Sequence, residues 1–114
     1  MNTEQQGFIA ASDYDRSSCQ VGIVHLGFGA FHRSHQAVYI DDYMDVSADL
    51  RWGIAAVNLR EADAASFKAA MDDYDRHDGY FVKSYSANGQ EKLRRVRSHV
   101  SSVSYTHLTL PTKA

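Results

Sequence analysis

Cysteine and proline are almost absent from this sequence: Cys19 is the only cysteine and Pro111 the only proline. A single cysteine excludes an internal disulfide and is typical of a reducing compartment. We interpret Cys19 as a small apolar residue beside the first strand, because free cysteine behaves as a small hydrophobe. No apolar run approaches the ~18 residues of a transmembrane helix, and no basic-then-apolar secretion signal opens the chain. We therefore expect a cytoplasmic protein.

An excess of charge of one sign is also missing. The net charge is -2 and the pI about 6.3, which gives no electrostatic reason to expect nucleic acid or an anionic membrane as a partner. With 114 residues, 44% of them hydrophobic, the chain has enough apolar material for one globular core.

The most informative stretch is an apolar run followed by two glycines. Val21–Leu26 has the length and β-branched content of a strand buried on both faces. Gly27 and Gly29 then allow a sharp turn and close approach of the backbone to a ligand. A strand, a glycine turn and a helix N-terminus predict an anion site, most commonly for the pyrophosphate of a dinucleotide. The spacing is a variant one, because His32 stands where a third glycine is usual.

Residues 27–36 read Gly-Phe-Gly-Ala-Phe-His-Arg-Ser-His-Gln. This turn resembles that of the mannitol dehydrogenase family, where the pattern is Gly-x-Gly-x-Phe-His-Arg-Ala-His-Gln; only Ser34 departs from it. The resemblance implies a partial NAD-binding Rossmann domain over residues 19–102. The expected cofactor-binding residues of the turn are Gly27, Phe28, Gly29, Ala30, Phe31, His32 and Arg33.

The same resemblance implies an activity. The family contains NAD-dependent dehydrogenases that oxidise a secondary alcohol of a polyol, such as C2 of mannitol, to a ketone. Two alternatives stay open: a reductase of a sugar acid of the fructuronate type, and a stand-alone nucleotide-binding module without catalysis. The family's lysine base, with its asparagine and histidine, has no match here, so no catalytic residue is assigned; Lys68, Lys83 and Lys92 lie in the wrong segments.

The remaining pattern predicts an α/β fold: an incomplete Rossmann-type parallel sheet, beginning as a βαβ unit, with an added β-hairpin. Helical spacing of apolar residues covers about residues 31–44 and 63–74, and a second buried strand is expected over 52–59. An Asn-Gly turn joins strands at 80–85 and 91–100. The basic residues of the latter strand, Lys92, Arg94, Arg95 and Arg97, are interpreted as a solvated face.

Charged residues follow the second predicted strand at once. The end of this strand usually carries the carboxylate that binds the adenosine ribose. Glu61 is the first choice for that role and Asp63 the second, whereas Arg60 could instead bind the 2'-phosphate of NADP. The alternative without ligand binding is a solvent-exposed turn in which Asp63 is the N-cap of the next helix. NAD is favoured, because Glu61 would repel a 2'-phosphate.

Three histidines near the glycine turn are candidate metal ligands. His25, His32 and His35 lie close enough in sequence for a shared site, but no cysteine or carboxylate accompanies them at matching spacing, so no metal is expected. His77 and His99 are interpreted as surface residues.

The two ends of the chain have a different character. Residues 1–18 are a polar lead, expected to be poorly ordered or to lie on the surface. Residues 103–112, Val-Ser-Tyr-Thr-His-Leu-Thr-Leu-Pro-Thr, resemble one reading frame of the transposon-end adapter used to prepare sequencing libraries. We therefore expect residues 103–114 to be a non-native, adapter-derived tail. On this interpretation the natural protein continues beyond about Ser102, and the chain as given is an inactive N-terminal fragment.

Overall fold

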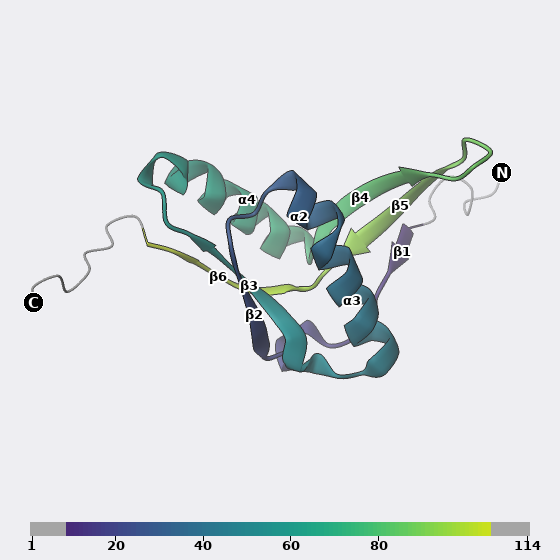
Figure 1. The fold of residues 1–114 in the computed structure, drawn as a ribbon, viewed down its shortest axis with the longest axis horizontal. Helices are drawn as coiled ribbons and strands as arrows, with labels where there is room; N and C mark the ends of the chain where they lie inside the picture. Colours follow the sequence, from purple (N-terminus) through teal and green to yellow (C-terminus); the bar gives the residue numbers. More distant parts are fainter. Residues whose placement is uncertain (1–8, 106–114) are drawn as a thin grey trace, which may run out of the picture.

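The computed structural model describes residues 9–105, which form two three-stranded sheets and the helices packed on them (Figure 1). In chain order the elements are β1 (Ile9–Ala11), η1 (Arg16–Ser18), β2 (Val21–Leu26), α2 (Ala30–Ser34), α3 (Gln36–Ser47), η2 (Leu50–Trp52), β3 (Gly53–Asn58), η3 (Glu61–Asp63), α4 (Ala64–His77), β4 (Tyr80–Tyr85), β5 (Glu91–Val96) and β6 (His99–Ser104). One sheet has the order β2-β3-β6 and the other β1-β5-β4. The hairpin of β4 and β5 projects away from the first sheet, with β1 beside it (Figure 1).

The β2-β3-β6 sheet is parallel throughout, which confirms the predicted Rossmann-type α/β fold. Its central strand β3 is buried along its whole length, as a continuous apolar run predicts. β2 is an edge strand, and Val24 and Leu26 are each 64% exposed. The expectation that β2 is buried on both faces is therefore wrong: Val24 and Leu26 lie on the same face of the strand, and within residues 9–105 that face stays open to solvent.

The helix expected over residues 31–44 is two helices, α2 and α3, separated at His35. The backbone of His35 (φ -125°, ψ -79°) is outside the helical region, and its ring nitrogen lies 3.0 Å from the Phe31 carbonyl. α3 also runs further than expected, to Ser47, and ends at the left-handed residue Ala48. The negative charges in its later turns do not end it, because Asp41 is paired with Arg94.

The second half of the fold also departs from the predicted boundaries. α4 continues to His77 and ends where Asp78 and Gly79 adopt φ values of 53° and 128°. The predicted hairpin is confirmed as the antiparallel pair of β4 and β5. However, the strand expected over residues 91–100 is divided: β5 ends at Val96, and β6 begins at His99 in the parallel sheet.

The hydrophobic core lies between the parallel sheet, α3, α4 and the base of the hairpin. Its buried members are Ala37, Ile54, Ala56, Phe67, Met71, Tyr74, Tyr80 and Val96. None of the helices within residues 9–105 has the length and apolar character needed to span a membrane.

The described residues of the segment before β2 are mostly exposed, in keeping with one of the two alternatives expected for the polar lead, a position on the surface, and they are joined to the rest of the fold by strand pairing and hydrogen bonds. β1 pairs in parallel with β5, and the buried guanidinium of Arg97 donates to the carbonyls of Ser12 (3.1 Å) and Tyr14 (2.9 Å). Arg16 donates to the carbonyl of His99 (3.0 Å). The solvated-face interpretation is thus wrong for Arg97, and also for Arg94, whose guanidinium contacts Asp41; a row of charges along a strand does not reveal acceptors brought from elsewhere in the chain.

At the other end, β6 includes two residues of the suspected adapter-derived tail. Val103 and Ser104 pair with Val57 and Asn58 of β3. Residues 1–8 and 106–114 lie outside the described part of the chain. The adapter origin of residues 103–114 stays a prediction.

Candidate nucleotide site

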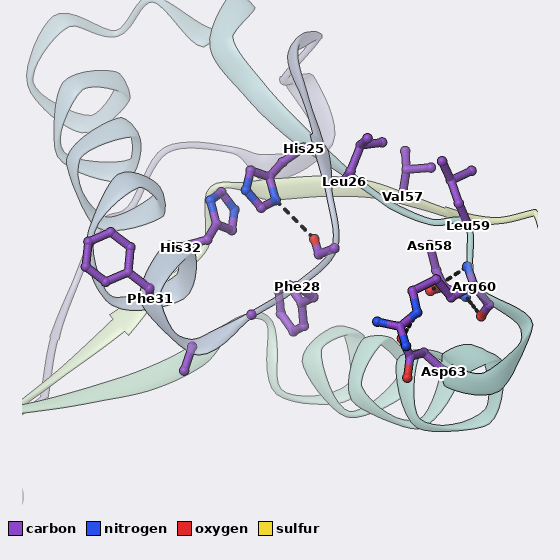
Figure 2. A pocket seen from close by; sticks show the side chains of 13 residues that line it. His25, Leu26, Phe28, Phe31, His32, Val57, Asn58, Leu59, Arg60 and Asp63 are labelled. Carbon is purple, nitrogen blue, oxygen red and sulfur yellow. Dashed lines mark hydrogen bonds and ion pairs between the residues drawn. The ribbon is translucent and has the colours of Figure 1, made fainter.

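A pocket of about 760 Å³ lies beyond the carboxyl ends of β2 and β3 (Figure 2). Ligands of open parallel α/β sheets bind at this edge, because the loops that leave the strands are free to form a crevice there. The lining residues are His25, Leu26, Gly27, Phe28, Gly29, Ala30, Phe31, His32, Val57, Asn58, Leu59, Arg60 and Asp63.

The two glycines of the turn have different structural roles. Gly27 has φ +103°, a conformation that favours glycine, and its N–H donates to the Val57 carbonyl (2.7 Å), which ties the turn to β3. Gly29 has an ordinary extended backbone and is the N-cap of α2. A Cβ on Gly29 would meet no atom within 4 Å and would project into open space. The fold therefore requires glycine at position 27, whereas at position 29 glycine keeps the pocket clear.

His32 replaces the usual third glycine and is buried under the turn. Its ring stacks on that of His25, with centroids 3.6 Å apart, and the two rings lie face to face in Figure 2. His25 Nδ1 lies 3.2 Å from the Gly27 carbonyl, which links this stack to the glycine turn. His32 Nε2 lies 2.9 Å from Nε2 of His99. The prediction that His99 is a surface residue is wrong: its side chain is fully buried among aromatic rings.

Arg33 does not line this pocket. Its guanidinium stacks on the rings of Phe28 (4.5 Å) and Tyr80 (4.7 Å), and its carbonyl accepts a hydrogen bond from the Tyr80 hydroxyl. Arg33 thus connects the residue between the two glycines to the hairpin, and it lines an adjacent pocket of about 260 Å³ that also contains Gly27, Gly29 and Asp63.

The other side of the pocket is formed by the residues after β3. Asn58 holds the start of this loop by donating to the Arg60 carbonyl (2.9 Å) and accepting from its N–H (3.3 Å). The Arg60 guanidinium lies 3.3 Å from the Asp63 carboxylate, and both side chains line the pocket (Figure 2). Glu61 is exposed and does not line it. Asp63 occupies the N-cap position of α4, but its side chain makes no capping hydrogen bond.

Within residues 9–105, no group of three or more His, Cys, Asp or Glu side chains is arranged to hold a metal ion. The parallel stacking of His25 and His32 explains this in part, since rings lying face to face do not aim their lone pairs at one point. His35 lies on the outside of α2, stacked on Phe31 at 4.2 Å.

The glycine turn and the parallel sheet can be compared with known protein families. The family model of the mannitol dehydrogenase Rossmann domain matches residues 21–109. The chain belongs to the mannitol dehydrogenase family. This confirms the resemblance drawn from residues 27–36.

Individual members of the mannitol dehydrogenase family support the assignment. A mannitol 2-dehydrogenase from Cereibacter sphaeroides is 43% identical over 56 residues, which cover 49% of this chain and 12% of that protein. A D-mannonate oxidoreductase from Escherichia coli (strain K12) is 49% identical over 51 residues, 45% of this chain and 10% of that protein. The matches thus span only 10–12% of the length of these relatives.

Solved structures of polyol dehydrogenases show the same fold. The ternary complex of Pseudomonas fluorescens mannitol 2-dehydrogenase with NAD and D-mannitol aligns with a TM-score of 0.69 and 27% identity, over 90% of this chain and 20% of that chain. Substrate-free D-sorbitol dehydrogenase aligns with a TM-score of 0.72 and 24% identity, over the same shares of the two chains.

Within this member of the family, the pocket brings together Gly27, Phe28, Gly29, Ala30, Phe31 and His32, six of the eight residues expected to bind a cofactor. Arg33 and Glu61 do not line it, while Asp63, the second choice for the ribose carboxylate, does. Sequence reasoning did not assign Asn58 or His99 to the site. Asn58 carried a signal, as the one polar side chain in an apolar strand; His99 carried none.

Proposed function

We propose that this chain is the NAD-binding part of a dehydrogenase that oxidises a secondary alcohol of a polyol to a ketone. The observation that carries the proposal is the pocket at the carboxyl ends of two parallel strands, bounded by Gly27 and Gly29 on one side and Asp63 on the other. The ternary complex of the Pseudomonas fluorescens relative contains NAD and D-mannitol, which supports the choice of cofactor and substrate class.

The residues present fit a dinucleotide. The open space in front of Gly29 lets the backbone approach a pyrophosphate closely, which is the role of the second glycine in dinucleotide turns. Asp63 is placed to accept hydrogen bonds from the ribose hydroxyls, and its negative charge disfavours a 2'-phosphate. Apolar side chains of Leu26, Val57 and Leu59 line the same pocket. These offer an apolar surface for the adenine.

When bound, NAD supplies a hydride acceptor: the carbinol carbon loses a hydride to the nicotinamide and its hydroxyl loses a proton. Within residues 9–105, no lysine lines the pocket, so the lysine base of the family has no counterpart there. Lys68 and Lys83 are paired with Asp72 (2.8 Å) and Glu91 (3.0 Å), and these partners raise the lysine pKa, the opposite of what a base needs. The catalytic residues of the whole enzyme are therefore proposed to lie in other segments.

A sugar acid is the second candidate substrate, because the Escherichia coli relative is named for D-mannonate. The DNA sequence of the gene distinguishes the enzyme from a nucleotide-binding module without catalysis. If several hundred codons with a lysine, asparagine and histidine cluster follow Ser102, the enzyme is favoured. A stop codon immediately after Ser102 would exclude the enzyme.

Cofactor preference follows from the pair Arg60 and Asp63. We expect NADH to bind more tightly than NADPH, because Asp63 repels the 2'-phosphate and already engages Arg60. Asp63→Asn is expected to reduce this preference by about fivefold or more, since one charge repulsion of roughly 1 kcal/mol is removed. The matched control is Glu61→Gln, which removes the same charge outside the pocket and should leave the preference unchanged. Fluorescence titration with both cofactors measures these ratios. Tighter binding of NADPH by the unmodified chain would show that Arg60 outweighs the carboxylate.

The chain as given is expected to form no NADH from NAD and D-mannitol, because no lysine of residues 9–105 lines the pocket and the family's lysine base is proposed to lie in another segment. Absorbance at the NADH band, followed with high protein concentration, provides the measurement. Turnover that is abolished by Gly29→Val would contradict the proposal that the catalytic residues lie elsewhere.

A further inference from the structure

One histidine of the pocket wall, His32, is paired with a second histidine, His99, that is buried behind the wall, and the nucleotide assignment leaves this pair unexplained. His32 lines the pocket from α2, and its Nε2 lies 2.9 Å from Nε2 of His99, the first residue of β6. His99 is fully buried and His32 is 6% exposed. Two imidazole nitrogens at this distance share one proton, because two N–H groups or two lone pairs would repel each other.

The partners of the two rings determine which ring carries that proton. His32 Nδ1 lies 2.9 Å from Oε1 of Gln36, which is an acceptor, so the neutral His32 ring has its hydrogen on Nδ1 and a lone pair on Nε2. His99 Nε2 must then be the donor. The remaining nitrogen of His99, Nδ1, is buried and has no hydrogen-bond partner within residues 9–105.

This arrangement opposes protonation of either ring. A protonated His32 would have to donate from Nε2, which would force the hydrogen of His99 onto Nδ1, where no described group accepts it. A protonated His99 would carry an unpartnered N–H and a positive charge in an apolar aromatic cluster. The pair is therefore stable only with both rings neutral.

The groups around the histidine pair also oppose its protonation. The titratable and charged neighbours are His25 from β2, Arg16 from η1, Arg33 from α2, Tyr74 from α4 and Tyr80 from β4; α3 contributes the uncharged Gln36. None of these neighbours is a carboxylate. Burial and then the neighbouring histidines lower the pKa of His99 to about 3, and burial also lowers the pKa of His32.

We propose that His99 is a positioning residue of the nucleotide pocket: its Nε2–H holds His32 as a neutral imidazole, so that this wall carries no charge when a pyrophosphate binds. The inference rests on the proposed function and deepens it. An ordinary histidine beside a phosphate would become cationic below about pH 6.5 and would strengthen binding as the pH falls. With His32 held neutral, this residue adds no pH dependence to the affinity for a pyrophosphate ligand across this range; His25, which lines the same pocket, is a separate contribution.

The first test needs no ligand. NMR of the imidazole groups follows the titration of His32 in the unmodified chain, in His99→Leu and in His99→Gln. The unmodified chain is expected to show a His32 midpoint below the ordinary histidine value of about 6.5, and His99→Leu should show a higher midpoint than the unmodified chain, because the donor to Nε2 is lost while the burial of His32 is kept. His99→Gln keeps an N–H donor and should restore the low midpoint. A His32 midpoint near 6.5 in the unmodified chain would overturn the proposal, even if the leucine variant fails to fold.

The second test uses ADP-ribose as the pyrophosphate ligand and adenosine as a control without phosphate, both by calorimetry. Between about pH 8 and 5.5, the increase in ADP-ribose affinity should be about three- to tenfold larger for His99→Leu than for the unmodified chain or His99→Gln, since His25 lines the pocket in all three chains. Adenosine affinity should be independent of pH in all three. An equal pH dependence of ADP-ribose affinity in the three chains would refute the inference. If His32 stays neutral but ADP-ribose does not bind at all, the histidine pairing is supported and the nucleotide function fails.

Discussion

Replacing Asp41 by asparagine is expected to lower the free energy of unfolding by about 3 kcal/mol, because it removes the charge of a buried, paired carboxylate. Asp41 is 0% exposed, and its carboxylate joins segments that are distant in the sequence. Its hydrogen-bond donors are the hydroxyls of Ser12 (2.9 Å) and Tyr14 (2.6 Å), the N–H of Arg97 (3.2 Å) and the guanidinium of Arg94 (2.5 Å). An amide NH₂ cannot accept from these donors. Urea denaturation followed by circular dichroism measures the loss.

Asp42 provides the matched control for this prediction. Its carboxylate lies 2.7 Å from the same Arg94 guanidinium, but its side chain is 53% exposed. Asp42→Asn should therefore change the stability by less than about 1 kcal/mol, as for most exposed ion pairs. Equal losses from the two substitutions would mean that burial of Asp41 is unimportant, and would contradict its assignment as the link between the N-terminal segment, α3 and β5.

Gly29→Val is expected to weaken NAD binding by about 30-fold or more, corresponding to roughly 2 kcal/mol, while leaving the fold intact. A Cβ at this position meets no atom within 4 Å, and a valine side chain would occupy the space proposed for the pyrophosphate. Its extended backbone is compatible with valine, so the stability should fall by less than about 1 kcal/mol.

Gly27→Ala should show the opposite pattern. Its φ of +103° is unfavourable for alanine, and we expect a loss of stability of about 1–3 kcal/mol. Calorimetry with NAD and urea denaturation, applied to both variants, separate the two glycine roles. Undiminished NAD binding by Gly29→Val, in a folded protein, would place the ligand elsewhere.

The features predicted correctly from sequence are those encoded locally. The run Val21–Leu26 followed by Gly27 encodes a strand and its turn, because a β-branched apolar run favours a strand and the turn needs a positive φ. The hairpin of β4 and β5 is specified in the same way by its Asn88-Gly89 turn. The fold class and the position of the pocket follow from these short segments.

The features that were missed depend on contacts between distant segments. His99 and Arg97 are polar residues in a basic, serine-containing stretch, and only the approach of α2, α4 and the N-terminal segment buries them. The division between β5 and β6 has no glycine or proline to mark it. The choice between Glu61 and Asp63 depends on η3, whose single turn leaves Glu61 outside the pocket and Asp63 along it.

The most direct test of the account is to map bound NAD onto the backbone by NMR of the ¹⁵N-labelled chain. The account predicts saturable shifts of amides in residues 27–32 and 58–63, the two sides of the pocket, with the exposed turn of the β4–β5 hairpin unaffected. Shifts concentrated on the hairpin, or no shifts at millimolar NAD in a folded sample, would contradict a dinucleotide site at the glycine turn.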